Sequence, residues 1–180
     1  MAVTELGQQT GKRRFFKLNA KSCELVESIK DVDWRKDVPR KWIEWKFVKV
    51  LLENKEYEWK STEFIRLILQ DWEETYEIGT SWSTVGQSLI NSLAWTVEKG
   101  TLGNVSVSMW YKEVDEKKYP RLYIKNNAEN TTRMYSIEEQ KEMIETILNK
   151  KWEYVSRDYS TYIEKLKSHL DKINANEDVF

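Results

Sequence analysis

Hydrophobic and polar residues alternate along much of the chain up to residue 126, as they do in half-buried β-strands. Because successive side chains of a strand point to opposite faces, such alternation gives one apolar and one polar face. We expect five main strands on this pattern, at residues 43–52, 64–72, 75–82, 105–112 and 119–125. Two earlier segments, 13–18 and 23–29, are expected to pair as a hairpin, whereas Pro39 and its charged neighbours predict a loop at 30–41.

Two segments carry the helical period of three to four residues instead. Ser83 is a favourable N-cap, and the apolar residues that follow it predict a short helix ending near Trp95. Ser136 and Glu139 form the pattern of a capping box, and an apolar stripe spaced by threes and fours continues from there to Ile173. We therefore expect one long C-terminal helix over residues 136–173.

The main elements follow one another as three strands, a short helix and two strands, which is the order of an OB barrel. We predict a mainly β fold with α: an OB-type five-stranded barrel with an intervening short helix, an N-terminal hairpin and a long C-terminal helix. The chain then divides into a flexible N-terminus, an OB domain, a C-terminal helix and an acidic tail, at residues 1–11, 12–135, 136–173 and 174–180. The long stripe also predicts self-association by helix pairing, with packing of its first half on the barrel as the alternative.

Aromatic residues are the outlier of the composition. Nine Trp, nine Tyr and five Phe make up 13% of the 180 residues. A core of this size does not need so many rings, so some are expected at a surface where flat amphipathic side chains stack on a ligand. The net charge is −1, but residues 10–49 hold twelve basic and six acidic side chains, whereas residues 50–80 hold three and eight. One basic and one acidic face are therefore expected.

Several kinds of chemistry find no support in the sequence. The six glycines form no phosphate-binding loop. His169 is the single histidine and Cys23 the single cysteine, which excludes a structural zinc site and an internal disulfide. We expect an inert Cys23, a solvated His169 and no enzymatic activity, cofactor or metal. Neither a signal peptide nor an apolar run of about 18 residues is present, which predicts a cytoplasmic protein without a membrane anchor.

Two Glu-x-Lys tripeptides, 44–46 and 58–60, leave an enzymatic alternative open. In one class of metal-dependent nucleases a strand carries this tripeptide after an upstream Asp, which Asp33 or Asp37 would supply here. The acids would hold a divalent cation, and the Lys would stabilise charge that develops during the reaction. The signal is weak, because such tripeptides arise by chance in a chain that is 33% charged.

Aromatic and basic side chains share one face of several predicted strands. Rings can stack on unpaired bases, and Lys and Arg neutralise phosphates, so the mixture suits single-stranded nucleic acid. No basic recognition helix for the major groove of a duplex is evident. The candidate nucleic-acid-binding residues are Trp45, Phe47, Lys49, Arg66, Trp72, Trp110, Lys112, Arg121, Tyr123 and Lys125.

Residues 43–127 resemble the OB-fold single-stranded DNA-binding proteins of bacteria and bacteriophages, in a divergent phage-type branch. The segments Phe64–Trp72, Trp82–Leu93 and Tyr119–Tyr123 carry this likeness. It implies a protein that coats single-stranded DNA during replication or recombination, in a bacterial cell or a phage-infected host, with RNA left open as a ligand. The long C-terminal helix is not part of the simple bacterial pattern.

The C-terminal tail points to a partner. Glu177, Asp178 and Phe180 resemble the acidic, Phe-ending tip by which bacterial members recruit replication and repair proteins. Val179 stands where that tip usually has Pro, and the flexible linker before it is missing. Such a tip is suited to a basic-rimmed apolar pocket.

A third function class is a protein-interaction module, such as a phage inhibitor of a host factor, whose Trp-rich surface binds protein.

Overall fold

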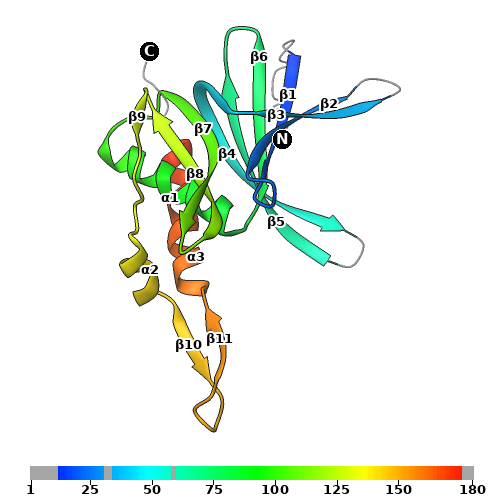
Figure 1. The fold of residues 1–180 in the computed structure, drawn as a ribbon. Helices are drawn as coiled ribbons and strands as arrows, with labels where there is room; N and C mark the ends of the chain where they lie inside the picture. The colour runs from blue at the N-terminus through cyan, green and yellow to red at the C-terminus, as the bar shows by residue number, and fades with distance from the viewer. Residues whose placement is uncertain (1–11, 31–33, 58–59, 176–180) are drawn as a thin grey trace, which may run out of the picture.

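The computed structural model describes residues 12–30, 34–57 and 60–175, and the fold is mainly β with fewer helices (Figure 1). The expected flexible N-terminus, residues 1–11, and the tail residues Glu177, Asp178 and Phe180 lie outside these ranges. The strands are β1 (Lys12–Asn19), β2 (Glu24–Lys30), β3 (Arg35–Arg40), β4 (Trp42–Tyr57), β5 (Lys60–Gln70), β6 (Glu74–Ser81), β7 (Asn104–Val114), β8 (Lys117–Asn126), β9 (Glu129–Asn130), β10 (Glu145–Leu148) and β11 (Tyr154–Asp158). The helices are α1 (Thr84–Lys99), α2 (Ile137–Glu142), α3 (Ser160–Ser168) and α4 (Leu170–Asn174).

Nine strands form one sheet in the order β3-β2-β1-β6-β5-β4-β7-β8-β9. β4, β5 and β6 make an antiparallel meander, α1 follows, and β7 returns to pair with the first residues of β4. β1 runs parallel to β6 and forms a hairpin with β2, in which Phe15 faces Ser28. The expected order of three strands, a helix and two strands is confirmed, and so is the N-terminal hairpin.

The sheet curls without closing as the expected five-stranded barrel. In such a barrel the third and fifth strands would pair, but the neighbours of β6 are β1 and β5, and those of β8 are β7 and β9. The turn between β1 and β2 instead reaches across to β7, where the Tyr111 hydroxyl donates a hydrogen bond of 3.1 Å to the carbonyl of Lys21. The N-terminal hairpin thus occupies the place that barrel closure would need.

Two strand boundaries also differ from expectation. The predicted loop at 30–41 contains β3, whose Pro39 is tolerated because β3 is an edge strand of the sheet. The strand expected at 43–52 runs from Trp42 to Tyr57, since the polar residues at its end continue the pairing with β5 up to Lys60. At both places, cross-strand pairing extends through residues whose composition is typical of loops.

The inner face of the sheet and the helices enclose one apolar core. Ile65, Leu67 and Leu69 of β5 are fully buried, as their alternation predicted. Leu89, Ile90 and Leu93 recur at helical spacing on α1 and pack into the same cluster, as do Tyr162, Leu166 and Ile173 of α3 and α4. Within the described ranges, no helix combines the length and apolar character needed to cross a bilayer.

The expected continuous helix over residues 136–173 is wrong. Its capping box is present, with Ser136 Oγ accepting from the Glu139 amide at 3.2 Å, but α2 ends at Glu142. Residues 145–158 form the separate hairpin β10–β11, which extends away from the body in Figure 1. β-Branched and aromatic residues in this stretch favour strands, and their spacing fits a helix only by coincidence. Helical structure resumes at Ser160.

Candidate nucleic-acid interface

The outer face of β7 and β8 carries exposed rings and cations together. Val105, Val107 and Met109 point into the core, so the residues between them point outward, as predicted. On β8, Ile124 is buried, and the side chains on either side of it face solvent. Cross-strand pairing sets Trp110 beside Arg121, Ser108 beside Tyr123, Ser106 beside Lys125, and Lys112 beside Tyr119.

Trp42 joins this face from β4 and was missed by the sequence reading. Its Cα partner on β7 is Ser108, which pairs in turn with Tyr123, so the three side chains form one row across the sheet. Ile43 is buried, and alternation therefore turns Trp42 outward, where it is 60% exposed. Four exposed rings result on what we call the aromatic–basic face, defined by Trp42, Trp110, Tyr119 and Tyr123 with Lys112, Arg121 and Lys125.

A groove of about 750 Å³ adjoins this face along β8. Of the residues that the structure describes, three cations line it, Lys112, Arg121 and Arg133, and no Asp or Glu does. Ser and Thr hydroxyl groups complete the walls. Some come from α1, such as that of Ser88, and others from the segment after β9, such as that of Thr131. A concave surface with cations, hydroxyls and no carboxylate is favourable for phosphate groups.

Two anchors hold the far wall of the groove in place. The amide and hydroxyl of Thr131 both donate to the Ile124 carbonyl, at 3.0 and 2.9 Å. Asn91, buried in α1, donates to the Tyr135 carbonyl at 3.1 Å and accepts from the Tyr135 amide at 2.8 Å. Arg133 lies between these anchors, so its position depends on contacts with two distant elements. No local sequence pattern could have identified it.

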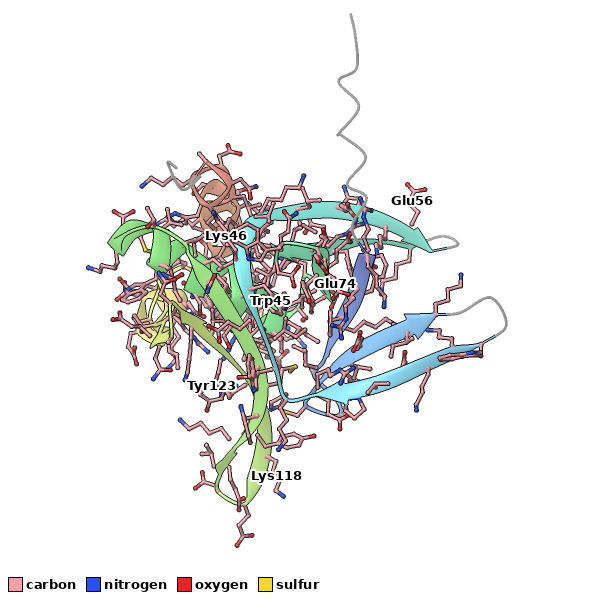
Figure 2. All side chains as sticks on the ribbon, turned by 90° about the horizontal axis from the view of Figure 1, so that it is seen from above. Trp45, Lys46, Glu56, Glu74, Lys118 and Tyr123 are labelled. Carbon is pink, nitrogen blue, oxygen red and sulfur yellow. The ribbon has the colours of Figure 1, made fainter. Side chains whose placement is uncertain are left out.

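Trp45 and Phe47 do not belong to the aromatic–basic face. The register of β4 shifts between Phe47 and Lys49, as at a β-bulge, so alternation is not continuous along the strand. Phe47 is buried in the core, and Trp45 lies on the inner side, stacked on Tyr76 with ring centroids 5.1 Å apart. Figure 2 shows Trp45 and Glu74 toward the middle of the curled sheet, whereas Tyr123 lies along the β7–β8 hairpin. Trp45 is 38% exposed but on the inner side, so the prediction that both rings share the outer face with the cations is wrong.

The remaining candidates are also separate from that face. Lys49 is half-buried opposite Ile68 on β5. Arg66 is held between Glu53, at 2.6 Å, and Glu77, at 3.2 Å, which neutralise its charge. Trp72 is fully exposed, but it follows the end of β5 and lies in the turn before β6 rather than on a strand face. The structure thus brings together five of the ten predicted residues: Trp110, Lys112, Arg121, Tyr123 and Lys125.

An ion-pair network centred on the buried Glu27 occupies the inner side of the sheet near Trp45. Glu27 accepts from Arg14 at 2.7 Å and from Arg40 at 2.7 Å, and Arg14 also reaches Glu74 at 3.3 Å. Burial alone would raise the pKa of Glu27, but the hydrogen bonds from the two guanidinium groups outweigh it and lower the pKa. Burial and the hydrogen bond to Glu74 raise the pKa of Tyr76 to about 12. The network is closed on itself and has the character of a structural element.

Within the described part of the chain, the Glu-x-Lys alternative gains no further ligand. Glu58, Trp59 and Asp33 lie outside the described residues, and Asp37 accepts from Ser28 at 2.9 Å on β3. Among the residues that the structure describes, no group of three His, Cys, Asp or Glu side chains is arranged to hold a metal ion.

The single cysteine and the single histidine both lie in the folded interior, fully or partly buried. Cys23 is buried beside the β1–β2 turn, and this burial raises the pKa of its thiol. The expectation of a solvated His169 is wrong, because the side chain is half-buried and its Nε2 lies 2.7 Å from the Tyr135 hydroxyl. Burial, with a smaller contribution from Lys172, lowers the pKa of His169.

Comparison with known proteins gave no relative: no family model matches the chain, and neither the curated proteins nor the solved structures contain a match. The arguments on function therefore rest on the geometry of the chain itself.

Proposed function

We propose that the protein binds single-stranded nucleic acid, with DNA as the principal ligand, on the aromatic–basic face and the adjoining groove. One observation carries the proposal: four exposed rings and three cations share one face of β4, β7 and β8, beside a groove that no carboxylate of the described residues lines. Base stacking on such rings contributes roughly 1–3 kcal/mol per base and tolerates any sequence. The cations add phosphate contacts whose strength depends on salt.

The arrangement suits an unpaired strand better than a duplex. Rings that stand on a sheet face are accessible to splayed bases, whereas bases stacked inside a duplex are not. The rows Trp42–Ser108–Tyr123 and Trp110–Arg121 place rings and a cation on neighbouring residues of adjacent strands. A strand crossing these rows would alternate bases on rings with phosphates on cations, and the groove would receive its continuing backbone.

We further propose that residues 42–126 are a variant of the OB plan. The support is the pairing of β4 with both β5 and β7, with α1 inserted between β6 and β7. The N-terminal hairpin would replace the pairing that closes an ordinary OB barrel. The biological role would be the non-catalytic coating of DNA in replication or recombination, which is the role that the resemblance implies.

Fluorescence titration with poly(dT) tests the binding proposal. Stacking should quench the Trp emission of the full chain, and the double variant W42A/W110A should lose both part of the quenching and about tenfold or more in affinity. Trp72→Ala is the control, since Trp72 is an even more exposed indole that lies outside the aromatic–basic face. An unchanged emission spectrum of the native protein at saturating poly(dT) would reject the proposed function.

A further inference from the structure

The β10–β11 hairpin has no partner within its own chain. Its two strands form a sheet of their own, so both outer edges are unpaired in the described structure. Figure 1 shows it projecting from the body below α2 and α3. It exposes six large apolar side chains, each at least 42% accessible: Ile147, Leu148, Trp152, Tyr154, Val155 and Tyr159.

Such a hairpin needs something to cover it. An isolated two-stranded hairpin is at best marginally stable in water, because two strands bury too little apolar surface. A projecting element that exposes this many large apolar side chains is typical of an interaction surface. Unpaired edges also invite pairing with a strand of another chain.

The tip of the hairpin is nevertheless firmly built. Asn149 Oδ1 accepts from the amides of Lys151 and Glu153, at 2.8 and 3.0 Å, and Asn149 Nδ2 donates to the Glu153 carboxylate at 2.8 Å. The Trp152 amide donates to the Asn149 carbonyl at 2.9 Å, and Trp152 itself has φ of 64°. These bonds hold the turn in one conformation, so little conformational entropy would be lost when the hairpin docks.

Charge identifies the partner. Residues 142–158 carry four acidic and three basic side chains, so the hairpin has no net attraction for phosphates. The charges are unevenly spread along it: the tip carries Lys150, Lys151 and Glu153, a net +1, and the base carries Glu142, Glu145, Arg157 and Asp158, a net −2. When two such hairpins lie side by side in opposite directions, the basic tip of each meets the acidic base of the other. The surface is therefore complementary to itself.

We propose that this hairpin is a dimerisation arm whose occupant is a second copy of the chain. The two arms pack antiparallel about a twofold axis, cover each other's apolar side chains and pair tip lysines with base glutamates. A twofold contact of this kind uses the same patch on both subunits and closes on itself. It replaces the helix pairing expected from the sequence, and it does not depend on nucleic-acid binding.

Light scattering of the full chain, with dilution monitored by sedimentation, measures the mass. A dimer of twice 21.6 kDa is expected at micromolar concentration. The tip variant K150E/K151E and the base variant E142K/E145K should each run as monomers, because tip and base then carry the same sign. An equimolar mixture of the two should recover the dimer, since each tip again meets a base of opposite charge. The control K117E/K118E makes the same charge change on the β7–β8 turn and should stay dimeric.

A second variant separates charge from apolar burial. L148T/Y154T keeps β-branched residues in both strands but removes apolar surface, and it should weaken the dimer by about tenfold or more. A native chain that stays monomeric at all concentrations, or charge variants that remain dimeric alone, would overturn the proposal. The proposal would also be overturned if the native chain were monomeric and its Trp152→Ala variant lost affinity for poly(dT), because the arm would then contact nucleic acid. If the monomeric charge variants still bind poly(dT), dimerisation and nucleic-acid binding are independent, and the failure of one proposal leaves the other intact.

Discussion

Asn174 of α4 holds the backbone of Val50 in β4 through two hydrogen bonds. Its Oδ1 accepts from the Val50 amide at 2.7 Å, and its Nδ2 donates to the Val50 carbonyl at 2.8 Å. The pairing of β7 with β4 ends at Lys46, so no strand of the described residues satisfies these groups on that side. A side-chain amide thus takes the place of a neighbouring strand and ties the C-terminal helices to the sheet.

Asn174→Ala should lower the free energy of unfolding by about 1–3 kcal/mol, because two half-buried backbone groups lose their partners. Urea denaturation followed by circular dichroism measures the change. Asn130→Ala is the control, since Asn130 is exposed on β9 and should have little effect. Equal stability of the two variants would show that water replaces the Asn174 amide without cost.

Phe47 and Tyr123 should separate stability from binding. Phe47→Ala empties a core position and is expected to cost about 3–5 kcal/mol of unfolding free energy. Tyr123→Ala removes an exposed ring and should change stability by no more than about 0.5 kcal/mol. In poly(dT) titrations the Tyr123 variant should bind more weakly, whereas a milder Phe47→Leu variant should bind normally. If the Phe47→Leu variant keeps native stability but loses affinity for poly(dT), Phe47 would be part of the binding surface.

The salt dependence of binding reports phosphate contacts. Each contact to a single strand contributes about −0.7 to the slope of log K against log salt. Lys125→Ala and Arg133→Ala should each make the slope shallower by about that amount. Arg66→Ala should leave it unchanged, because Arg66 is already neutralised by Glu53 and Glu77. A slope that Arg66→Ala alone alters would place the phosphates on β5.

Glu27 should support stability at neutral pH. Its pKa is lowered in the folded state, so the stabilisation is present above the ordinary carboxyl pKa of about 4.5 and is lost as pH falls through the folded value. Glu27→Gln leaves Arg14 and Arg40 without their shared carboxylate and should cost about 3 kcal/mol at pH 7. The loss should shrink in acid. Glu24→Gln, on the exposed side of the same strand, is the control.

His169 should make stability sensitive to mild acid. Its pKa is lowered in the folded state, so the unfolded chain binds the proton more tightly, and stability falls as pH drops below the usual value of about 6.5. A protonated Nε2 can only donate to the Tyr135 hydroxyl oxygen. Because this is the single histidine, His169→Gln should flatten the unfolding free energy between about pH 7.5 and 5.5. An unchanged pH profile in the variant would assign the effect elsewhere.

The sequence by itself determined which side chains of β7 and β8 face outward. Alternation there is unbroken, and neighbouring residues alone encode it, so Trp110, Tyr123 and their cations were placed correctly. The same reasoning failed at β4, where the register shift after Phe47 reverses the parity of the strand. It failed again at β10–β11, where the spacing of apolar residues fits both a helix and a hairpin.

Only the tertiary structure decided how the binding surface is assembled. Trp42 joins the aromatic–basic face through pairing with a strand more than sixty residues later. Arg133 reaches the groove because Asn91, in a different element, fixes the chain at Tyr135. The physical reason is the range of the interactions. Periodicity is a property of adjacent residues, whereas pairing, register shifts and anchoring hydrogen bonds join residues that meet only when the whole chain has folded.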